Sequence, residues 1–159
     1  MTVRKSFYII LVASLLIFIT SCDLNRYYEK NHPLDNHSWE RGGFVGFQVD
    51  IQDTLSPFNF IINIRHNTDY RYNNIFLFLN TLYPDGNQSR DTLECLLAAP
   101  DGEWYGKGAG KIKEIQVLFK RNVLFPMKGI YEFKFEQAMR VEELQGMEDF
   151  GIRIEKFKE

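Results

Sequence analysis

The chain has 159 residues, of which 45% are hydrophobic and 25% charged, and its 19 basic and 21 acidic side chains leave a net charge of −2. This balance excludes a strongly basic nucleic-acid-binding protein. The length suits one domain, and 14 Phe residues supply much of the material for a buried core.

The first 21 residues have the pattern of a secretory signal peptide. Arg4 and Lys5 give it a basic start, and an apolar run from Phe7 to Ile19 follows. This run has about 13 residues, fewer than the ~20 that a helix needs to span the hydrocarbon core of a bilayer. We therefore expect residues 1–21 to be removed as a signal peptide.

The run ends in Ile-Thr-Ser-Cys at residues 19–22, which resembles a bacterial lipobox. In a lipobox the cysteine thiol takes up a diacylglycerol as a thioether, and the peptidase then cuts just before that cysteine. A third, amide-linked chain makes the attachment nearly irreversible, because each buried CH₂ contributes about 0.8 kcal/mol. The sequence thus predicts lipidation of Cys22. The alternatives are an ordinary signal peptide that ends in cysteine by chance, or an uncleaved anchor.

Residues 22–38 predict a polar, lipid-anchored tether ahead of the folded part. The stretch contains Pro33 and has no regular spacing of apolar side chains. His32, Asp35 and His37 are metal ligands by type, but ordering a site in a tether costs entropy, so we predict no metal site. The absence of an acidic run directly after Cys22 resembles the lipoproteins that face the periplasm.

Residues 39–159 alternate apolar and polar side chains with a period of two, which is typical of strands with one face on a core. Turn-forming Pro, Asp and Gly residues separate these runs. The predicted strands are 45–51, 58–65, 75–79, 92–97, 115–119, 131–136 and 150–154. About seven strands with no long helical segment predict an all-β domain, an antiparallel β-sandwich for which a jelly roll is one arrangement. Residues 139–144 are expected to form one helical turn that ends at Gly146.

Two of the predicted strands carry a further expectation. The run Ile75 to Leu79 is apolar at every position, so we expect a central strand that is covered on both faces. Cys95 shares a strand face with Leu93 and Leu97, which favours a buried, inert thiol over a reactive one. If Cys22 carries lipid, Cys95 is the remaining cysteine and no disulfide forms within the chain.

No stretch of the chain predicts catalysis. Residues 106–111, Gly-Lys-Gly-Ala-Gly-Lys, look like a phosphate-binding loop, but the outer glycines are one residue too close and no Ser or Thr follows the second lysine. Nothing in the sequence sets the adjacent acidic pairs at 142–143 and 148–149 opposite each other as an acid and a base. A nucleophile elbow and a zinc motif are both missing. The sequence therefore predicts a protein that is not an enzyme and needs no cofactor.

Aromatic side chains raise the alternative of a glycan-binding module. Trp39, Tyr70, Tyr72, Trp104 and Tyr105 fall in or near the expected loops. Rings at the rim of a β-sandwich can stack on sugars or anchor a protein partner. Alternatively, the two tryptophans close the ends of the core. Exposed, coplanar rings would favour glycan binding, whereas buried rings would favour a protein partner or a structural role.

Four segments together carry a family resemblance: TSCD at 20–23, YRYNNIFLFLNTLYPDG at 70–86, DTLECLLAAPDGEWYGKGAG at 91–110 and FEQAMRVEELQGMEDFGIRIEK at 135–156. They resemble the GldH gliding-motility lipoproteins of the Bacteroidota, and the last segment is the most specific of the four. One departure is Phe150, where a smaller aliphatic residue is expected in this family.

The resemblance implies an outer-membrane lipoprotein that is needed for surface gliding, in a system tied to protein secretion, with no catalytic residues. Its partners are then the membrane, through the acyl chains, and other envelope proteins of the gliding and secretion apparatus. The expected surface for a partner or ligand consists of Trp39, Trp104, Tyr105, Arg140, Leu144, Asp149 and Arg153.

Two Asp-Thr-Leu triplets, around Thr54 and Thr92, resemble the Asp-Thr-aliphatic acceptor of periplasmic O-glycosylation in the Bacteroidota. Thr54 is the better candidate, because residues 52–57 are expected to form an exposed turn. Thr92 begins a predicted strand, where a glycan would crowd its neighbours.

Overall fold

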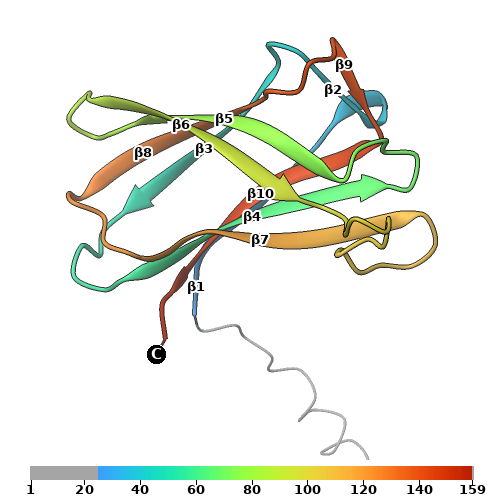
Figure 1. Ribbon diagram of the computed structural model, residues 1–159. Helices are drawn as coiled ribbons and strands as arrows, with labels where there is room; N and C mark the ends of the chain where they lie inside the picture. The colour runs from blue at the N-terminus through green and yellow to red at the C-terminus, as the bar shows by residue number, and fades with distance from the viewer. Residues whose placement is uncertain (1–24, 159) are drawn as a thin grey trace, which may run out of the picture.

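The computed structural model describes residues 25–158. The predicted signal peptide and Cys22 lie outside the described residues. Two four-stranded antiparallel sheets lie face to face and form a sandwich, which confirms the predicted fold class (Figure 1). In strand order, the first sheet contains β1 (Arg26–Pro33), β10 (Met147–Lys156), β4 (Phe58–Asn67) and β7 (Ile112–Val123). The second contains β3 (Phe44–Ile51), β8 (Gly129–Gln137), β5 (Asn74–Leu82) and β6 (Gln88–Leu96).

A third, two-stranded pair lies at one end of the sandwich (Figure 1). It joins β2 (Ser38–Glu40) to β9 (Glu143–Gln145), and a short 3₁₀ turn (η2, Asp35–His37) precedes it. The seven predicted strands correspond to β3 to β8 and β10. The three strands that the sequence did not predict are β1, β2 and β9.

The predicted tether is wrong at residues 26–33, which form the edge strand β1 and pair with β10. Its inner face carries Tyr28, Lys30 and His32, and its outer face carries Glu29 and Asn31, so no apolar alternation marks the strand. Hydrogen bonds replace that signal: the Asn63 side-chain amide donates to Glu29 Oε1 and to Asn31 Oδ1, both at 3.1 Å. An edge strand of this polarity also resists pairing with other chains.

The predicted helical turn at 139–144 is also wrong. Residues 138–142 bend, and β9 follows directly. Gly146 does not end a helix; it separates β9 from β10 with φ +87°. A Cβ atom at this position would lie 2.7 Å from the backbone nitrogen of Tyr70, so the close approach as well as the positive φ requires glycine.

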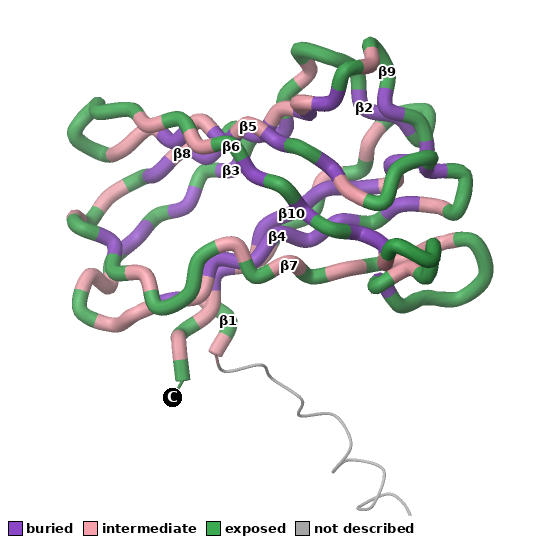
Figure 2. The backbone as a smooth tube through the Cα atoms, viewed as in Figure 1, coloured by how far each residue is buried: buried purple, intermediate pink, exposed green. Residues whose placement is uncertain are grey.

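Burial alternates along the strands as the period-two pattern predicts (Figure 2). Aromatic rings contribute to the contact between the sheets: Phe60 of β4 meets Phe133 of β8 edge to face, with ring centroids 5.0 Å apart, the arrangement that ring quadrupoles favour. The largest fully buried aromatic side chains are Phe58, Tyr131, Phe135 and Phe150.

Cys95 belongs to this core, as predicted. It is 1% exposed and lies beside Leu93 and Leu97. Burial raises the pKa of its thiol to about 12, so the reactive thiolate is scarce at neutral pH. Over residues 25–158 there is no helix with the length and apolar character to cross a bilayer.

Candidate functional site

Two residues of the expected partner surface lie in the core. Trp39 is 2% exposed and Leu144 is 1% exposed, and the two residues face each other across the β2–β9 pair. The indole N–H of Trp39 donates a 3.0 Å hydrogen bond to the carbonyl of Gly43. Trp104 is partly buried, and its ring centroid lies 4.4 Å from that of His66. For both tryptophans, the structure therefore supports the core alternative.

Two further residues of that surface lie on the outer face of the first sheet and are engaged in ion pairs. Asp149 pairs with Arg65 at 2.7 Å. Burial raises the pKa of Asp149, and the nearby Arg65 partly opposes that shift. Arg153, also in β10, bridges Glu29 and Glu155 at 3.2 and 2.9 Å. Arg140 instead follows β8 of the second sheet, so the predicted residues do not form one surface.

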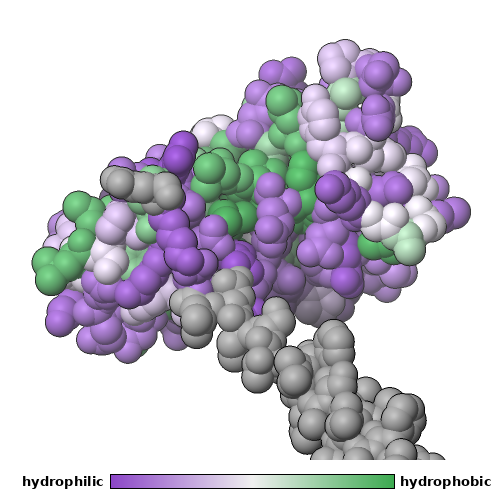
Figure 3. Space-filling view, turned by 90° about the horizontal axis from the view of Figure 1, so that it is seen from below, coloured by the Kyte–Doolittle hydropathy of each residue, from purple (hydrophilic) through white to green (hydrophobic). Residues whose placement is uncertain are grey.

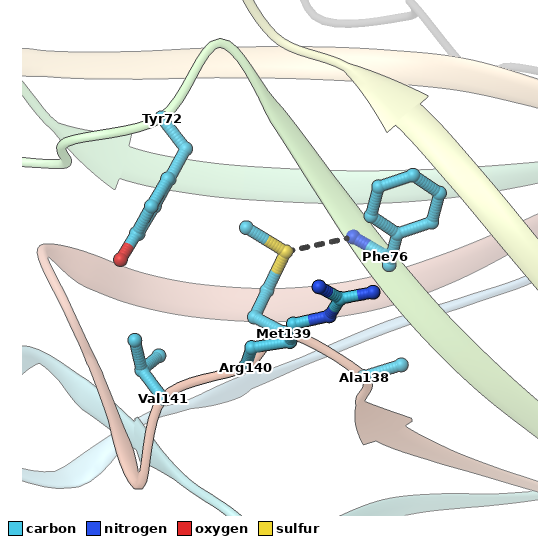
Figure 4. A pocket seen from close by; sticks show the side chains of 6 residues that line it. All are labelled: Tyr72, Phe76, Ala138, Met139, Arg140 and Val141. Carbon is cyan, nitrogen blue, oxygen red and sulfur yellow. Dashed lines mark hydrogen bonds between the residues drawn. The ribbon is translucent and has the colours of Figure 1, made fainter.

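Arg140 is exposed and lines a shallow depression of about 480 Å³ at the end of β8. Figure 4 shows how its side chain lies beside the ring of Phe76 and the thioether of Met139. The complete lining consists of Tyr72, Phe76, Ala138, Met139, Arg140 and Val141. These residues come from β5, the loop before it and the loop after β8.

The buried amide of Gln137 holds the loop in this shape. Its Nε2 donates to the carbonyl of Val141 at 3.0 Å, and its Oε1 accepts from the Met139 backbone N–H at 2.9 Å. The backbone N–H of Ala138 donates to the Phe76 carbonyl, and the Phe76 N–H donates to the sulfur of Met139 at 3.3 Å (Figure 4). The depression is therefore preformed, which lowers the entropy that a partner must overcome on binding.

Exposed aromatic side chains line this depression together with Arg140. Phe76 is 37% exposed and Tyr72 is 36% exposed. Leu96 is 53% exposed and is paired with Asn74 of β5. Asn74 and Phe76 are two residues apart, so they share a strand face, and Leu96 lies on that same face of the second sheet. We call Tyr72, Phe76, Leu96 and Arg140 the distal patch. Tyr and Arg next to apolar side chains are the combination found at energetic centres of protein interfaces.

The expectation that the apolar run 75–79 is covered on both faces is wrong for its outer face. The apolar run 75–79 lies in the interior strand β5, as expected, and its inner residues are buried. No second layer covers its outer face: Phe76 is exposed, and the guanidinium of Arg90 lies over Phe78, 4.2 Å from the ring centroid. An interior strand that is apolar on both faces in a two-layer fold indicates a surface that a partner can cover.

A buried histidine lies near the end of β4, an interior strand of the first sheet. His66 is 0% exposed, and its Nδ1–H donates a 2.9 Å hydrogen bond to the carbonyl of Asn67. Its Nε2 has no hydrogen-bond partner among the described residues. Burial lowers the pKa of His66, and the positive charge of Lys113 adds to that shift, so the ring is neutral at pH 7.

Acidification is expected to cost stability through His66. Because its pKa in the folded protein is below the ordinary value of about 6.5, the unfolded chain takes up the proton first, and the free energy of unfolding falls as the pH drops through that value. The variant His66→Phe keeps a ring and cannot titrate, so it should lose less stability between about pH 8 and pH 5. Urea unfolding at several pH values measures this, and parallel pH profiles for the two proteins would contradict it.

Outside the core, Glu148 ties the turn η2 to β4. It accepts hydrogen bonds from His37 and Asn67, both at 2.7 Å. Burial alone would raise the pKa of Glu148, but these hydrogen bonds outweigh it and hold the pKa below its usual range. This arrangement fixes the backbone of the turn against β4.

The remaining sequence candidates lie in the loop between β6 and β7. Residues 106–111 form part of the loop between β6 and β7, in which Lys107 and Glu114 exchange two backbone hydrogen bonds. Tyr105 is 51% exposed in the same loop. In the described part of the chain, no group of three or more His, Cys, Asp or Glu side chains is placed to hold a metal ion.

Known proteins resemble most of this chain. The family model described as "GldH lipoprotein" matches residues 26–154. The "Gliding motility lipoprotein GldH homolog" of Christiangramia forsetii is 38% identical over 160 residues, which cover 96% of this chain and 98% of that protein. The "Gliding motility lipoprotein GldH" of Flavobacterium johnsoniae is 36% identical over 155 residues, which cover 93% of this chain and 94% of that protein.

Among solved structures, the mitogen of Yersinia pseudotuberculosis aligns with 83% of this chain and 88% of its own, with a TM-score of 0.36 and 7% identity. That likeness is too weak to carry an argument. The family match and the two relatives extend over nearly the full length, and the predicted resemblance is confirmed by both. The chain belongs to the GldH lipoprotein family.

Proposed function

We propose that this protein is an outer-membrane lipoprotein that acts as a non-catalytic accessory or assembly component of the gliding-motility machinery and its associated secretion system. Residues 1–21 are its signal peptide, Cys22 carries the acyl chains, and the folded domain faces the periplasm. The printed names of the two relatives support the link to gliding. Membership of a lipoprotein family supports a membrane-anchored place in the cell envelope.

The observation that carries the accessory role is the distal patch. It combines exposed Phe76, Tyr72 and Leu96 with the cation of Arg140 on a preformed depression, and no other layer of the fold covers it. A patch of this kind binds a protein surface with apolar side chains and a carboxylate. We therefore assign it to contact with another envelope protein of the apparatus.

The alternative of a glycan-binding module receives less support. Trp39 and Tyr70 are 2% and 3% exposed, so neither ring can stack on a sugar. Tyr72 and Tyr105 are exposed, but they come from different loops, and Tyr72 packs edge to face against Tyr70. Buried rings of this kind favour a protein partner or a structural role over stacking on a sugar.

O-glycosylation at Thr54 and Thr92 stays a prediction. Thr54 is partly buried in the loop between β3 and β4. Thr92 is exposed in the middle of β6, an edge strand of the second sheet, with its side chain on the outer face. An exposed site on a sheet edge leaves more room for a glycan than the sequence suggested.

The partner role is tested by the double variant Phe76→Gln/Arg140→Glu in a strain that lacks the chromosomal gene. Loss of an interface centre costs 2 kcal/mol or more, so we expect partner binding to weaken about 30-fold or more. Colony spreading, or protein secretion where the host does not glide, should fall to the level of the deletion strain. Affinity capture from envelopes measures the lost partner directly.

The matched control is Ile130→Gln, which changes an exposed apolar side chain, 56% exposed, at the opposite end of β8. It should support normal spreading and secretion. Full activity of the double variant would overturn the distal patch as the binding surface. Normal spreading and normal secretion in the deletion strain itself would overturn the role in gliding and secretion.

A further inference from the structure

The folded domain begins very close to the proposed site of lipidation. The carbonyl of Asn25, three residues after Cys22, accepts a 2.8 Å hydrogen bond from the backbone N–H of Lys156 and so already belongs to the sandwich. Three residues span at most about 11 Å when fully extended. This inference rests on the proposed lipidation of Cys22: with acyl chains on that residue, the end of the sandwich that carries Asn25 must lie against the lipid headgroups.

The loop between β3 and β4 is fastened to that same end. The hydroxyl of Tyr27 donates to the carbonyl of Asp50 at 2.9 Å and accepts from the backbone N–H of Gln52 at 2.8 Å. On the other side, the backbone N–H of Phe157 donates to the carbonyl of Pro57 at 2.9 Å. Both ends of the described chain therefore hold this loop, and both leave the sandwich on the same side (Figure 1).

The loop presents a leucine to the outside. Leu55 is 90% exposed, more than any other large apolar side chain in residues 25–158. The Asp53 carboxylate accepts from the backbone N–H groups of Leu55 and Ser56 at 3.0 and 2.9 Å, and Lys156 pairs with it at 3.2 Å. Hydrogen bonds from Ser56 and Leu55 hold the pKa of Asp53 well below its usual range, so this turn persists at physiological pH.

Basic and apolar side chains surround this end. The guanidinium of Arg121 lies 5.2 Å from the ring centroid of Phe157, and Lys158 follows. Leu118 is 51% exposed on the outer face of the first sheet, where it pairs with Ile61. Seen from the side on which the chain ends leave, the surface carries separate apolar areas among polar ones (Figure 3). Cations beside exposed apolar groups suit an anionic lipid surface.

We propose that this end of the sandwich docks on the bilayer, with Leu55 inserted among the lipid headgroups and with Arg121 and Lys158 facing anionic lipid phosphates. Docking fixes the orientation of the domain. Gly129, the first residue of β8, pairs with Ile51, which directly precedes the loop between β3 and β4 and so lies at the docking end. The distal patch lies at the other end of β8, after Gln137. Nine residues of strand span roughly 30 Å, so the patch is held away from the membrane where a periplasmic partner can reach it.

Docking also bears on O-glycosylation. Thr54 is the neighbour of Leu55, so a glycan on Thr54 would separate the loop from the lipid. Thr92 lies on the outer face of the second sheet and is free of this conflict. A docked domain thus carries its glycan on Thr92 if it carries one at all.

The test places one environment-sensitive nitrobenzoxadiazole label on the acylated full-length protein, at Leu55→Cys or at the control Leu96→Cys. Both are exposed leucines, and the buried thiol of Cys95 leaves the introduced cysteine as the reactive one. The protein is reconstituted in vesicles of phosphatidylcholine with or without phosphatidylglycerol. Some vesicles also contain a lipid with a nitroxide near the headgroup end of its acyl chain, and mass spectrometry verifies the acyl chains on Cys22.

We expect the label at position 55 to shift its emission to the blue and to be quenched by the nitroxide lipid, more strongly with phosphatidylglycerol present. The label at position 96 should stay unshifted and unquenched. Acylated protein with equal emission and quenching at both positions would overturn docking and leave the anchor intact. Protein without acyl chains, or absent from the vesicles, would overturn the anchor and docking with it.

Discussion

Replacing Phe150 by alanine is expected to lower the free energy of unfolding by about 3–5 kcal/mol, as removal of a buried phenyl ring does. Phe150 is 0% exposed and lies where three elements meet. Its ring centroid lies 4.9 Å from that of Phe135 in the second sheet and 5.0 Å from that of Trp39 in β2. It therefore joins both sheets to the short β2–β9 pair. A smaller aliphatic residue, expected there from the family, would leave part of this space empty.

Urea or thermal unfolding of Phe150→Ala, Phe150→Leu and the unmodified protein measures this effect. The leucine variant should lose less, since it fills more of the space. The control Ile130→Ala removes an exposed side chain and should change stability by no more than about 0.5 kcal/mol. A Phe150→Ala variant as stable as the Ile130→Ala control would show that the ring does not hold the layers together.

Replacing Cys22 by serine is expected to abolish function without unfolding the domain. The serine hydroxyl cannot accept the diacylglycerol, so the precursor should accumulate uncut and the lipid anchor should be lost. Incorporation of a labelled fatty acid measures lipidation, and thermal unfolding of the protein measures stability. Retained label in Cys22→Ser would contradict the lipobox.

The variant Cys95→Ser is the matched control, because it makes the same change at a buried position. Its hydroxyl loses apolar contacts and is left without a suitable partner, at a cost on the order of 1–3 kcal/mol. Lipidation and localisation should persist while the melting temperature falls. An unchanged melting temperature together with lost function would indicate a working thiol in place of a structural one.

Period-two alternation was enough to predict the sandwich. Phe47, Phe135 and Ile152 lie on inner strand faces because a strand with one buried face must alternate, and that rule needs only the local sequence. The burial of Cys95 followed from its place between Leu93 and Leu97 in the same way. Lipidation of Cys22 is likewise a local expectation, since a peptidase recognises a short motif.

Only the tertiary structure decided which residues of the polar and short segments are buried. Strand β1 has no apolar face, and its pairing with β10 depends on partners more than 120 residues away, such as Arg153 for Glu29. The pair β2–β9 is too short to show a period, so the sequence left Trp39 open between core and surface and placed Leu144 on the surface. The distal patch shows the reverse error, since a strand face that was expected to be buried is exposed. Alternation cannot tell whether a second layer covers an apolar face, because that depends on which elements the chain places outside the sheet.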